Sequence, residues 1–281
     1  MIHQLHGKKI QMQSTSQVES RKLSASDRIL SAVLKSIPVK HGKHRLLDTI
    51  APSAIGRSDL PVQFEVQGQQ CVVEVDDLVG WHMAMLKSFD PEVIEVLSGC
   101  YEAGDVLWDI GANKCACSLF MAEKCGSLSV VAIEPQASLE GINRHNLSQV
   151  CEGRYEYYAL GIGEAVGELT LTVPSGNRGA ASFHTLPRGI SSGGWEEVCD
   201  IVTPARLEKL SSFGYPDLVK IDVEGHVWPV ISSLEGLFRK QRIKAVVFEN
   251  NCGRVNEFNN IHAAVSDCGY CLFGIERTPW R

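Results

Sequence analysis

VLWDIGANKCACS, residues 106–118, is the segment that decides the fold. A short apolar run ends at Asp109, a turn carries Gly111 and Asn113, and a helical stretch follows. Gly111 permits a tight turn because it has no Cβ, and the start of the next helix offers free N–H groups to a ligand. The segment therefore predicts a buried strand, a ligand-binding loop and a helix.

The same alternation of apolar runs and helical stretches continues toward the C-terminus. VVAIEP, LVKIDVEG and KAVVFEN each precede a helical stretch, and YCLFGIE is expected to close the chain as a strand. Short β-rich runs separated by helices predict an α/β fold with a mostly parallel, doubly wound sheet. Ligands bind such sheets at the carboxyl ends of the strands. Those ends are WDIGAN, AIEP, ALGIGE, KIDVEG and FEN, and they are rich in acidic side chains.

Composition excludes several classes of protein. The chain has 281 residues, of which 44% are hydrophobic and 21% charged, as in ordinary globular proteins. The net charge of −6 and the absence of a basic block argue against a nucleic-acid partner. The apolar runs are too short to span a bilayer, and the N-terminus lacks the apolar core of a secretory signal. We therefore expect a cytoplasmic protein with no membrane partner.

The ten cysteines are expected to be reduced, since a chain of this size does not need disulfides. Cys115 and Cys117 lack a second pair at zinc-ligand spacing. Cys268 and Cys271 have the spacing of a redox motif, but they follow a helix instead of starting one. Both pairs are interpreted as buried, small apolar side chains, with metal binding and redox chemistry as the alternatives.

Three parts are expected along the chain. Residues 1–25 are polar and predicted to be disordered. Residues 26–100 form an N-terminal extension, with helical spacing over 24–37 and two strands around a Gln-Gly turn over 62–75. Residues 101–281 form the main α/β domain.

The acidic strand ends indicate the kind of ligand. Asp109 at the turn disfavours an anion and favours a cationic ligand, and GxGxxG is missing. Glu134 ends the second strand, where an acidic side chain accepts hydrogen bonds from a ribose diol. The alternatives are a purely structural turn at Asp109 and an exposed carboxylate at Glu134.

KIDVEGH brings further polar residues to the same edge. Asp222, Glu224 and His226 are expected at the cleft, where one of them acts as a general base. The alternative is that Asp222 caps the next helix and His226 is merely exposed. Glu249 and Asn250, together with Asp222, provide oxygens that suit Mg²⁺. Hydrogen bonds among loops explain these residues better, so no metal site is assigned.

In combination, VLWDIGAN, VVAIEP, YALGIGEAVGELTL and LVKIDVEGH resemble the FkbM family of S-adenosylmethionine-dependent methyltransferases, over about residues 100–250. The resemblance implies a Rossmann-like class I methyltransferase domain with a seven-stranded, mostly parallel sheet whose last strand is antiparallel. It implies methyl-donor binding by Asp109, Gly111 and Asn113, ribose binding by Glu134, and a place for Leu160 in the same site. Asp222, Glu224 and His226 then lie near the reacting centre.

The resemblance also suggests the acceptor, a hydroxyl group on a sugar or a secondary metabolite, bound as a small molecule or a glycan. The Gly/Ser-rich stretch 175–194 is interpreted as a lid, with a solvated connector as the alternative. Residues in and beside it are candidates to contact the acceptor: Arg178, Phe183, Arg188 and Trp195. The oligomeric state is not predicted.

Three positions depart from the family pattern. Cys115 replaces the usual glycine, Val227 replaces a glutamate, and Tyr158 replaces an asparagine. A side chain at 115 approaches the donor unless it points into the interface between helix and sheet. A catalytically degenerate protein with the methyltransferase fold is therefore one alternative, and an NAD(P)-dependent oxidoreductase is another.

Overall fold

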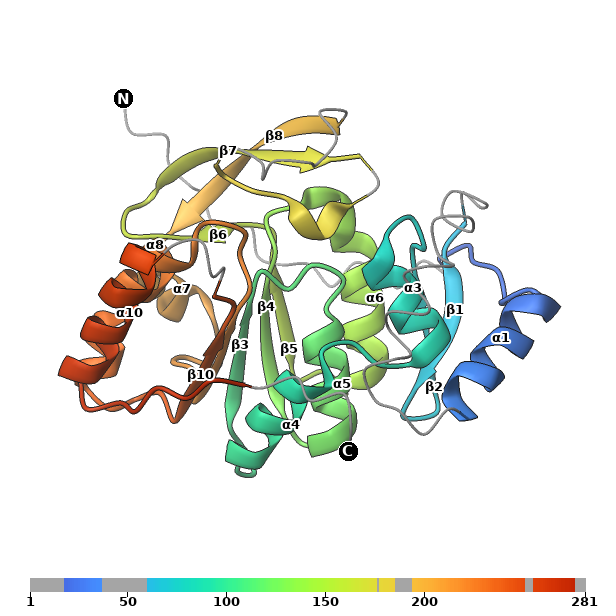
Figure 1. The fold of residues 1–281 in the computed structure, drawn as a ribbon, viewed down its shortest axis with the longest axis horizontal. Coiled ribbons are helices and arrows are strands. Elements are labelled where there is room, and N and C mark those ends of the chain that lie inside the picture. The colour runs from blue at the N-terminus through green and yellow to red at the C-terminus, as the bar shows by residue number, and fades with distance from the viewer. Residues whose placement is uncertain (1–17, 37–59, 176, 185–193, 251–254, 276–281) are drawn as a thin grey trace.

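The computed structural model describes residues 18–36, 60–175, 177–184, 194–250 and 255–275. Its centre is a five-stranded parallel sheet with helices on both faces (Figure 1). The strand order is β10-β9-β3-β4-β5. The strands are β3 (Val106–Ile110), β4 (Ser129–Ile133), β5 (Tyr155–Tyr158), β9 (Leu218–Ile221) and β10 (Ala245–Phe248). The central strands β3, β4 and β9 are buried along their whole length, which explains their continuous apolar runs.

Alternate residues of these strands enter two apolar cores. The helices that cover them are α5 (Ala116–Cys125), α6 (Glu140–Val150), α7 (Pro204–Leu210), α8 (Val227–Ser233), α9 (Glu235–Arg239) and α10 (Val255–Asp267). Leu107 and Val130 belong to the core under α5 and α6, whereas Trp108 and Val131 belong to the core under α7 to α10. Because both faces are covered, polar side chains of the sheet are confined mainly to its edges, where the strands end.

A second, three-stranded sheet lies over the carboxyl ends of the main sheet (Figure 1). It consists of β6 (Gly161–Ile162), β7 (Gly167–Pro174) and β8 (Gly194–Val202), in the order β6-β8-β7. A short helical turn, η3 (Arg178–Ala180), follows β7. Ser182 then forms bridges to Thr172 of β7 and to Glu224 in the loop after β9. These bridges join the second sheet to the main one.

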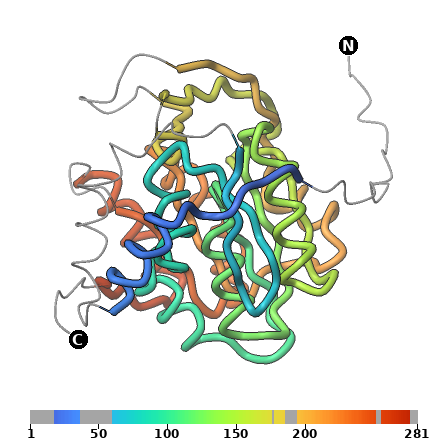
Figure 2. Tube along the Cα trace, turned by 90° about the vertical axis from the view of Figure 1, so that its right-hand side faces the viewer, coloured from blue at the N-terminus to red at the C-terminus, as the bar shows by residue number. Residues whose placement is uncertain are grey.

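The N-terminal elements pack on the α5 and α6 side of the sheet. They are α1 (Ala25–Ser36), β1 (Val62–Val66), β2 (Gln69–Val73), α3 (Leu78–Leu86) and α4 (Pro91–Cys100). The predicted hairpin turn is confirmed: Gln67 and Gly68 both have positive φ, as a two-residue turn of this kind requires. The hairpin runs alongside α6 (Figure 2), where Asn146 bonds both the N–H and the carbonyl of Val72, at 2.9 and 2.7 Å.

The predicted terminal strand is wrong over its described part. Residues 270–275 contain no strand: Tyr270 packs against the core under α7 to α10, but Phe273 is 83% exposed. The expected seven-stranded sheet is accordingly not confirmed. YEYYALGI is also split, because β5 joins the main sheet and β6 joins the second one.

The segment predicted to be disordered falls largely outside the described residues, which begin at Val18. Within it, Arg21 bonds β1 through its backbone: its N–H donates to Pro61 O at 2.8 Å, and its carbonyl accepts from Gln63 at 2.8 Å. Across the described part of the chain, no helix has both the length and the apolar character needed to cross a membrane.

Candidate functional site

The loop after β3 contacts both the end of β4 and the loop after β9. Gly111 and Ala112 both donate to Ile133 O, at 2.9 and 3.0 Å, and Asp222 N donates to Ile110 O at 3.0 Å. Gly111 has a φ of +72°, and a Cβ placed on it would lie 2.0 Å from the carbonyl oxygen of Asp222. This position therefore requires glycine both for its backbone conformation and for the contact.

Glu134 is held by two backbone N–H groups at the end of β4. Its Oε2 accepts from Asn113 N at 2.7 Å, and its Oε1 accepts from Gln136 N at 2.9 Å. Burial raises the pKa of Glu134 above its usual range, although these two donors oppose the rise. Each carboxylate oxygen has two lone pairs, so each keeps one for a ligand hydroxyl.

Asp109 points beneath the loop, away from the pocket. Its Oδ2 accepts from the N–H and the hydroxyl of Ser118, at 3.1 and 2.7 Å, and its Oδ1 lies 3.3 Å from Lys220 Nζ. Asp109 is fully buried and does not line the pocket. It holds the start of α5 against the sheet, so its contact with a ligand can only be indirect.

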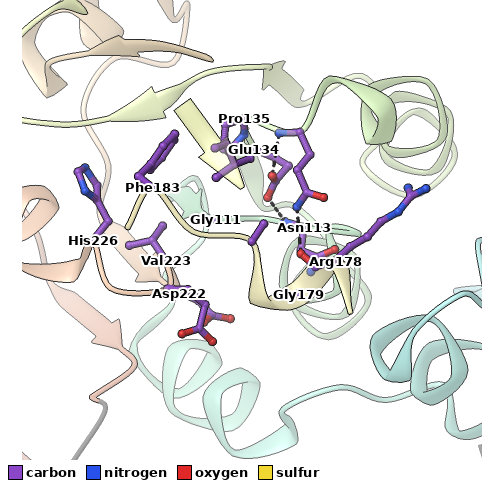
Figure 3. Close-up of a pocket in the computed structure, with 14 residues that line it drawn as sticks. Gly111, Asn113, Glu134, Pro135, Arg178, Gly179, Phe183, Asp222, Val223 and His226 are labelled. Atoms are coloured by element: carbon purple, nitrogen blue, oxygen red, sulfur yellow. Dashed lines mark hydrogen bonds between the residues drawn. The ribbon is translucent and has the colours of Figure 1, made fainter. Parts of the chain in front are cut away.

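The KIDVEGH segment forms the opposite wall. Asp222, Glu224 and His226 all line the pocket, as Figure 3 shows for Asp222 and His226. Ser182 Oγ donates to Glu224 O at 2.8 Å and thereby fixes this loop to the second sheet.

His226 is a buried imidazole whose ring packs edge-on against Phe183, with centroids 5.3 Å apart. Its Nδ1 lies 3.5 Å from Nε2 of His184. Burial and the nearby His184 ring lower the pKa of His226 below its usual 6.5. The ring is therefore neutral at pH 7, as a general base requires.

These walls line a hollow of about 450 Å³, a volume that includes space open to solvent. Six of the predicted site residues meet there: Gly111, Asn113, Glu134, Asp222, Glu224 and His226. Leu160 does not, because it lies in the core under α7 to α10.

The residues that were expected to contact the methyl acceptor do not all line the pocket. Arg178 and Phe183 line the pocket (Figure 3), while Trp195 lies beside it with its ring 5.4 Å from the Arg178 guanidinium carbon. Arg188 and residues 185–193 as a whole lie outside the described part of the chain.

Several lining residues were not predicted from the sequence. Pro135 and Gln136 directly follow Glu134, so VVAIEPQ contains a signal for them. Leu171, Gly179 and Ala181 reach the pocket only because the second sheet folds over it, which no local pattern indicates.

Ion pairs connect the N-terminal elements to this pocket. Arg178 contacts Glu74 at 2.7 Å and Asp76 at 2.9 Å. Lys114, next to Asn113 in the loop after β3, contacts Asp76 and Asp77 at 2.7 Å each. The segment between β2 and α3 therefore supports two walls of the pocket at once.

Cys115 lies at the start of α5 with a φ of +56°, a left-handed conformation that favours glycine. Its side chain is fully buried in the core under α5 and α6 and does not line the pocket. Cys117 and Cys268 are also buried, and all three are free thiols. The prediction that both members of each close pair are buried is wrong for Cys271, which is exposed.

A metal site at the ends of β9 and β10 finds no support. Among the described residues, no group of three or more His, Cys, Asp or Glu side chains is placed to hold a metal ion. Glu249 has its pKa raised to about 7 by partial burial and by the carboxylates of Asp222 and Glu224. Asn250, the third candidate ligand, is exposed.

A parallel α/β sheet with a glycine turn after one strand and a buried carboxylate after its neighbour is typical of Rossmann-like folds, which bind ligands at the carboxyl ends of their strands. The methyltransferase FkbM domain model matches residues 109–272, so the chain belongs to the FkbM methyltransferase family. Family membership supports a methyltransferase activity, for which S-adenosylmethionine is the general methyl donor.

Comparison with solved structures finds precorrin-6y C5,15-methyltransferase from Geobacter metallireducens GS-15. It is 17% identical, with a TM-score of 0.36, over 64% of this chain and 71% of that chain. At this TM-score the likeness supports no further conclusion. No curated protein matches the sequence.

The pocket residues suit S-adenosylmethionine. Asn113 Oδ1 and Gln136 Oε1 are buried and have no hydrogen-bond partner among the described residues. Both are acceptors beside Glu134, and buried acceptors are costly when unpaired. The ribose hydroxyls and the amino groups of S-adenosylmethionine are the donors that such acceptors need.

Proposed function

We propose that the protein transfers the methyl group of S-adenosylmethionine to a hydroxyl oxygen of a sugar or secondary metabolite, bound as a small molecule or a glycan. The observation that carries this proposal is a single pocket that contains both a buried carboxylate for a ribose, Glu134, and a buried neutral imidazole, His226. One side of the pocket suits a nucleoside, and the other suits removal of a proton.

The donor side has defined tasks. Glu134 accepts hydrogen bonds from the ribose hydroxyls, while Asn113 and Gln136 offer their unpaired oxygens to the remaining donors. When bound, S-adenosylmethionine supplies an electrophilic methyl group on a positively charged sulfonium. The acidic side chains that line the pocket favour that charge in the bound state. They favour the transition state less, because the positive charge falls as the methyl group leaves.

His226 is the better base of the two candidates in the loop after β9. Asp222 Oδ2 lies 3.3 Å from the Lys220 ammonium, so its charge is already compensated. Burial and the neighbouring His184 lower the pKa of His226, which keeps its imidazole able to accept a proton at pH 7. General base catalysis by a side chain contributes about 10²- to 10⁴-fold to a rate.

The position of Cys115 supports a working enzyme over a degenerate one. A side chain there threatens the donor only if it enters the pocket, and this one enters the core. Val227, another of the three departures, is buried at the start of α8 and does not line the pocket.

The test is incubation with isotope-labelled S-adenosylmethionine and a panel of sugars, glycans and small alcohols, followed by mass spectrometry. We expect label on an acceptor oxygen with the wild type, and a large loss of product with His226→Asn. Parallel samples with EDTA test metal dependence, and we expect equal product in both. Transfer to nitrogen or carbon contradicts O-methylation, and donor binding without product from any acceptor favours a non-catalytic protein.

A further inference from the structure

Lys220 is a buried cation to which the proposed reaction assigns no role. It lies near the end of β9 with its side chain only 10% exposed. Its Nζ donates to the carbonyl of Gly111 at 2.6 Å. The same atom lies 3.3 Å from Asp109 Oδ1 and 3.3 Å from Asp222 Oδ2.

The three partners come from both sides of the pocket. Asp109 lies near the end of β3 and supports α5. Gly111 belongs to the loop that faces the donor, and Asp222 belongs to the loop that carries Glu224 and His226. Burial would lower the pKa of Lys220, but the carboxylates of Asp222 and Asp109 raise it, so the ammonium stays charged. A charged donor makes a stronger hydrogen bond to a carbonyl than a neutral donor does.

We propose that Lys220 is a positioning residue for the pocket, whose ammonium ties the Gly111 carbonyl to the Asp222 carboxylate and so sets the spacing of the two walls. The backbones already touch here, since a Cβ on Gly111 would lie 2.0 Å from Asp222 O. Lys220 also fixes the orientation of the Gly111 carbonyl on one wall and of the Asp222 carboxylate on the other. The ligand named in the test below rests on the proposed function, but the positioning itself does not.

A simpler role would be to neutralise Asp109, which is fully buried. The single variant Lys220→Met does not separate the two roles, because it leaves a buried carboxylate unpaired and is expected to unfold easily. The double variant Lys220→Met/Asp109→Asn removes one charge of each sign and keeps an acceptor for Ser118. If neutralisation is the whole role, this variant regains both stability and pocket structure.

A matched control is available at the opposite end of the sheet. Lys244 Nζ lies 2.8 Å from Asp105 Oδ1, just before β3 begins. Lys244→Met/Asp105→Asn therefore removes one charge of each sign just before β10 and β3 without touching the pocket.

Two measurements decide the proposal, after urea unfolding has shown that both double variants are folded. The first is hydrogen–deuterium exchange of the ligand-free proteins over residues 109–116 and 222–227. We expect faster exchange in both segments of Lys220→Met/Asp109→Asn and no change in the control variant. Unchanged exchange in the Lys220 variant overturns the proposal.

The second measurement is titration with S-adenosylhomocysteine, the neutral product of the donor. We expect a Kd about 10- to 100-fold weaker in the Lys220 variant, which is the range for the loss of one charged hydrogen bond. A Kd equal to that of the wild type overturns the proposal, since Lys220 then serves only to neutralise Asp109. If the wild type fails to bind while exchange rises as expected, the proposed function fails and the positioning role stands.

Discussion

Gly111→Ala tests the closest contact in the pocket. Alanine at a φ of +72° pays the cost of a left-handed conformation, about 1–2 kcal/mol. Its Cβ would also lie 2.0 Å from Asp222 O and 2.9 Å from Asp222 C, which are backbone atoms that cannot rotate away. Forced overpacking of this kind costs about 1–3 kcal/mol more. The total expected loss of unfolding free energy is therefore about 2–5 kcal/mol.

Gly214→Ala is the matched control. Gly214 lies in the loop after α7 with a φ of +74°, and a Cβ there would meet nothing within 4 Å. Both substitutions place alanine at a similar positive φ and have the same effect on the unfolded chain, so their difference reports mainly the contact with Asp222. Urea unfolding should show Gly111→Ala to be less stable than Gly214→Ala by about 1–3 kcal/mol. Equal loss in both variants would refute the close approach of the two loops.

Three further variants test individual side chains. Cys115→Gly should change the Kd for S-adenosylhomocysteine less than about twofold, because the thiol lies in the core; a large gain in affinity by titration would instead support a degenerate wild type. His226→Asn should lower kcat by about 10²- to 10⁴-fold with little change in product binding. In the wild type, kcat should fall only below pH 6.5, since burial lowers the pKa of His226; an acid limb above pH 7 would argue against this base. Glu249 has a folded-state pKa of about 7, above its usual 4.5, so the folded state binds more protons and stability falls as pH rises between these values. Glu249→Gln should reduce that fall in urea unfolding at pH 5 and pH 8, and an unchanged slope would contradict the raised pKa.

The main sheet was predictable because its strands are short apolar runs with helical stretches between them. VLWDI, SVVAI and LVKI are buried on both faces, and this requirement is visible in the sequence itself. The second sheet was not predictable in the same way, since the split of YEYYALGI between two sheets depends on long-range pairing. The terminal strand was predicted from apolar content alone, and Phe273 shows that apolar content does not ensure burial.

Site residues could be predicted from the sequence where they follow directly after a strand, because ligands bind at the carboxyl ends of parallel strands. Glu134, Asp222, Glu224 and His226 were placed by this rule, and they line one pocket. The rule does not give the direction of a side chain, so Asp109 was expected in the pocket and lies beneath it. Contacts between residues far apart in the sequence could not be predicted by this rule either. Two examples are the ion pairs of Arg178 with Glu74 and Asp76, and the ring contact of His184 with His226.

The central claim is that the pocket binds the methyl donor through Glu134. Isothermal titration of S-adenosylhomocysteine into the wild type and Glu134→Ala tests it most directly. We predict binding by the wild type and a Kd at least about tenfold weaker in the variant, because two ribose hydroxyls lose a charged acceptor. Equal affinity in the two proteins, or no binding by the wild type, would contradict the claim.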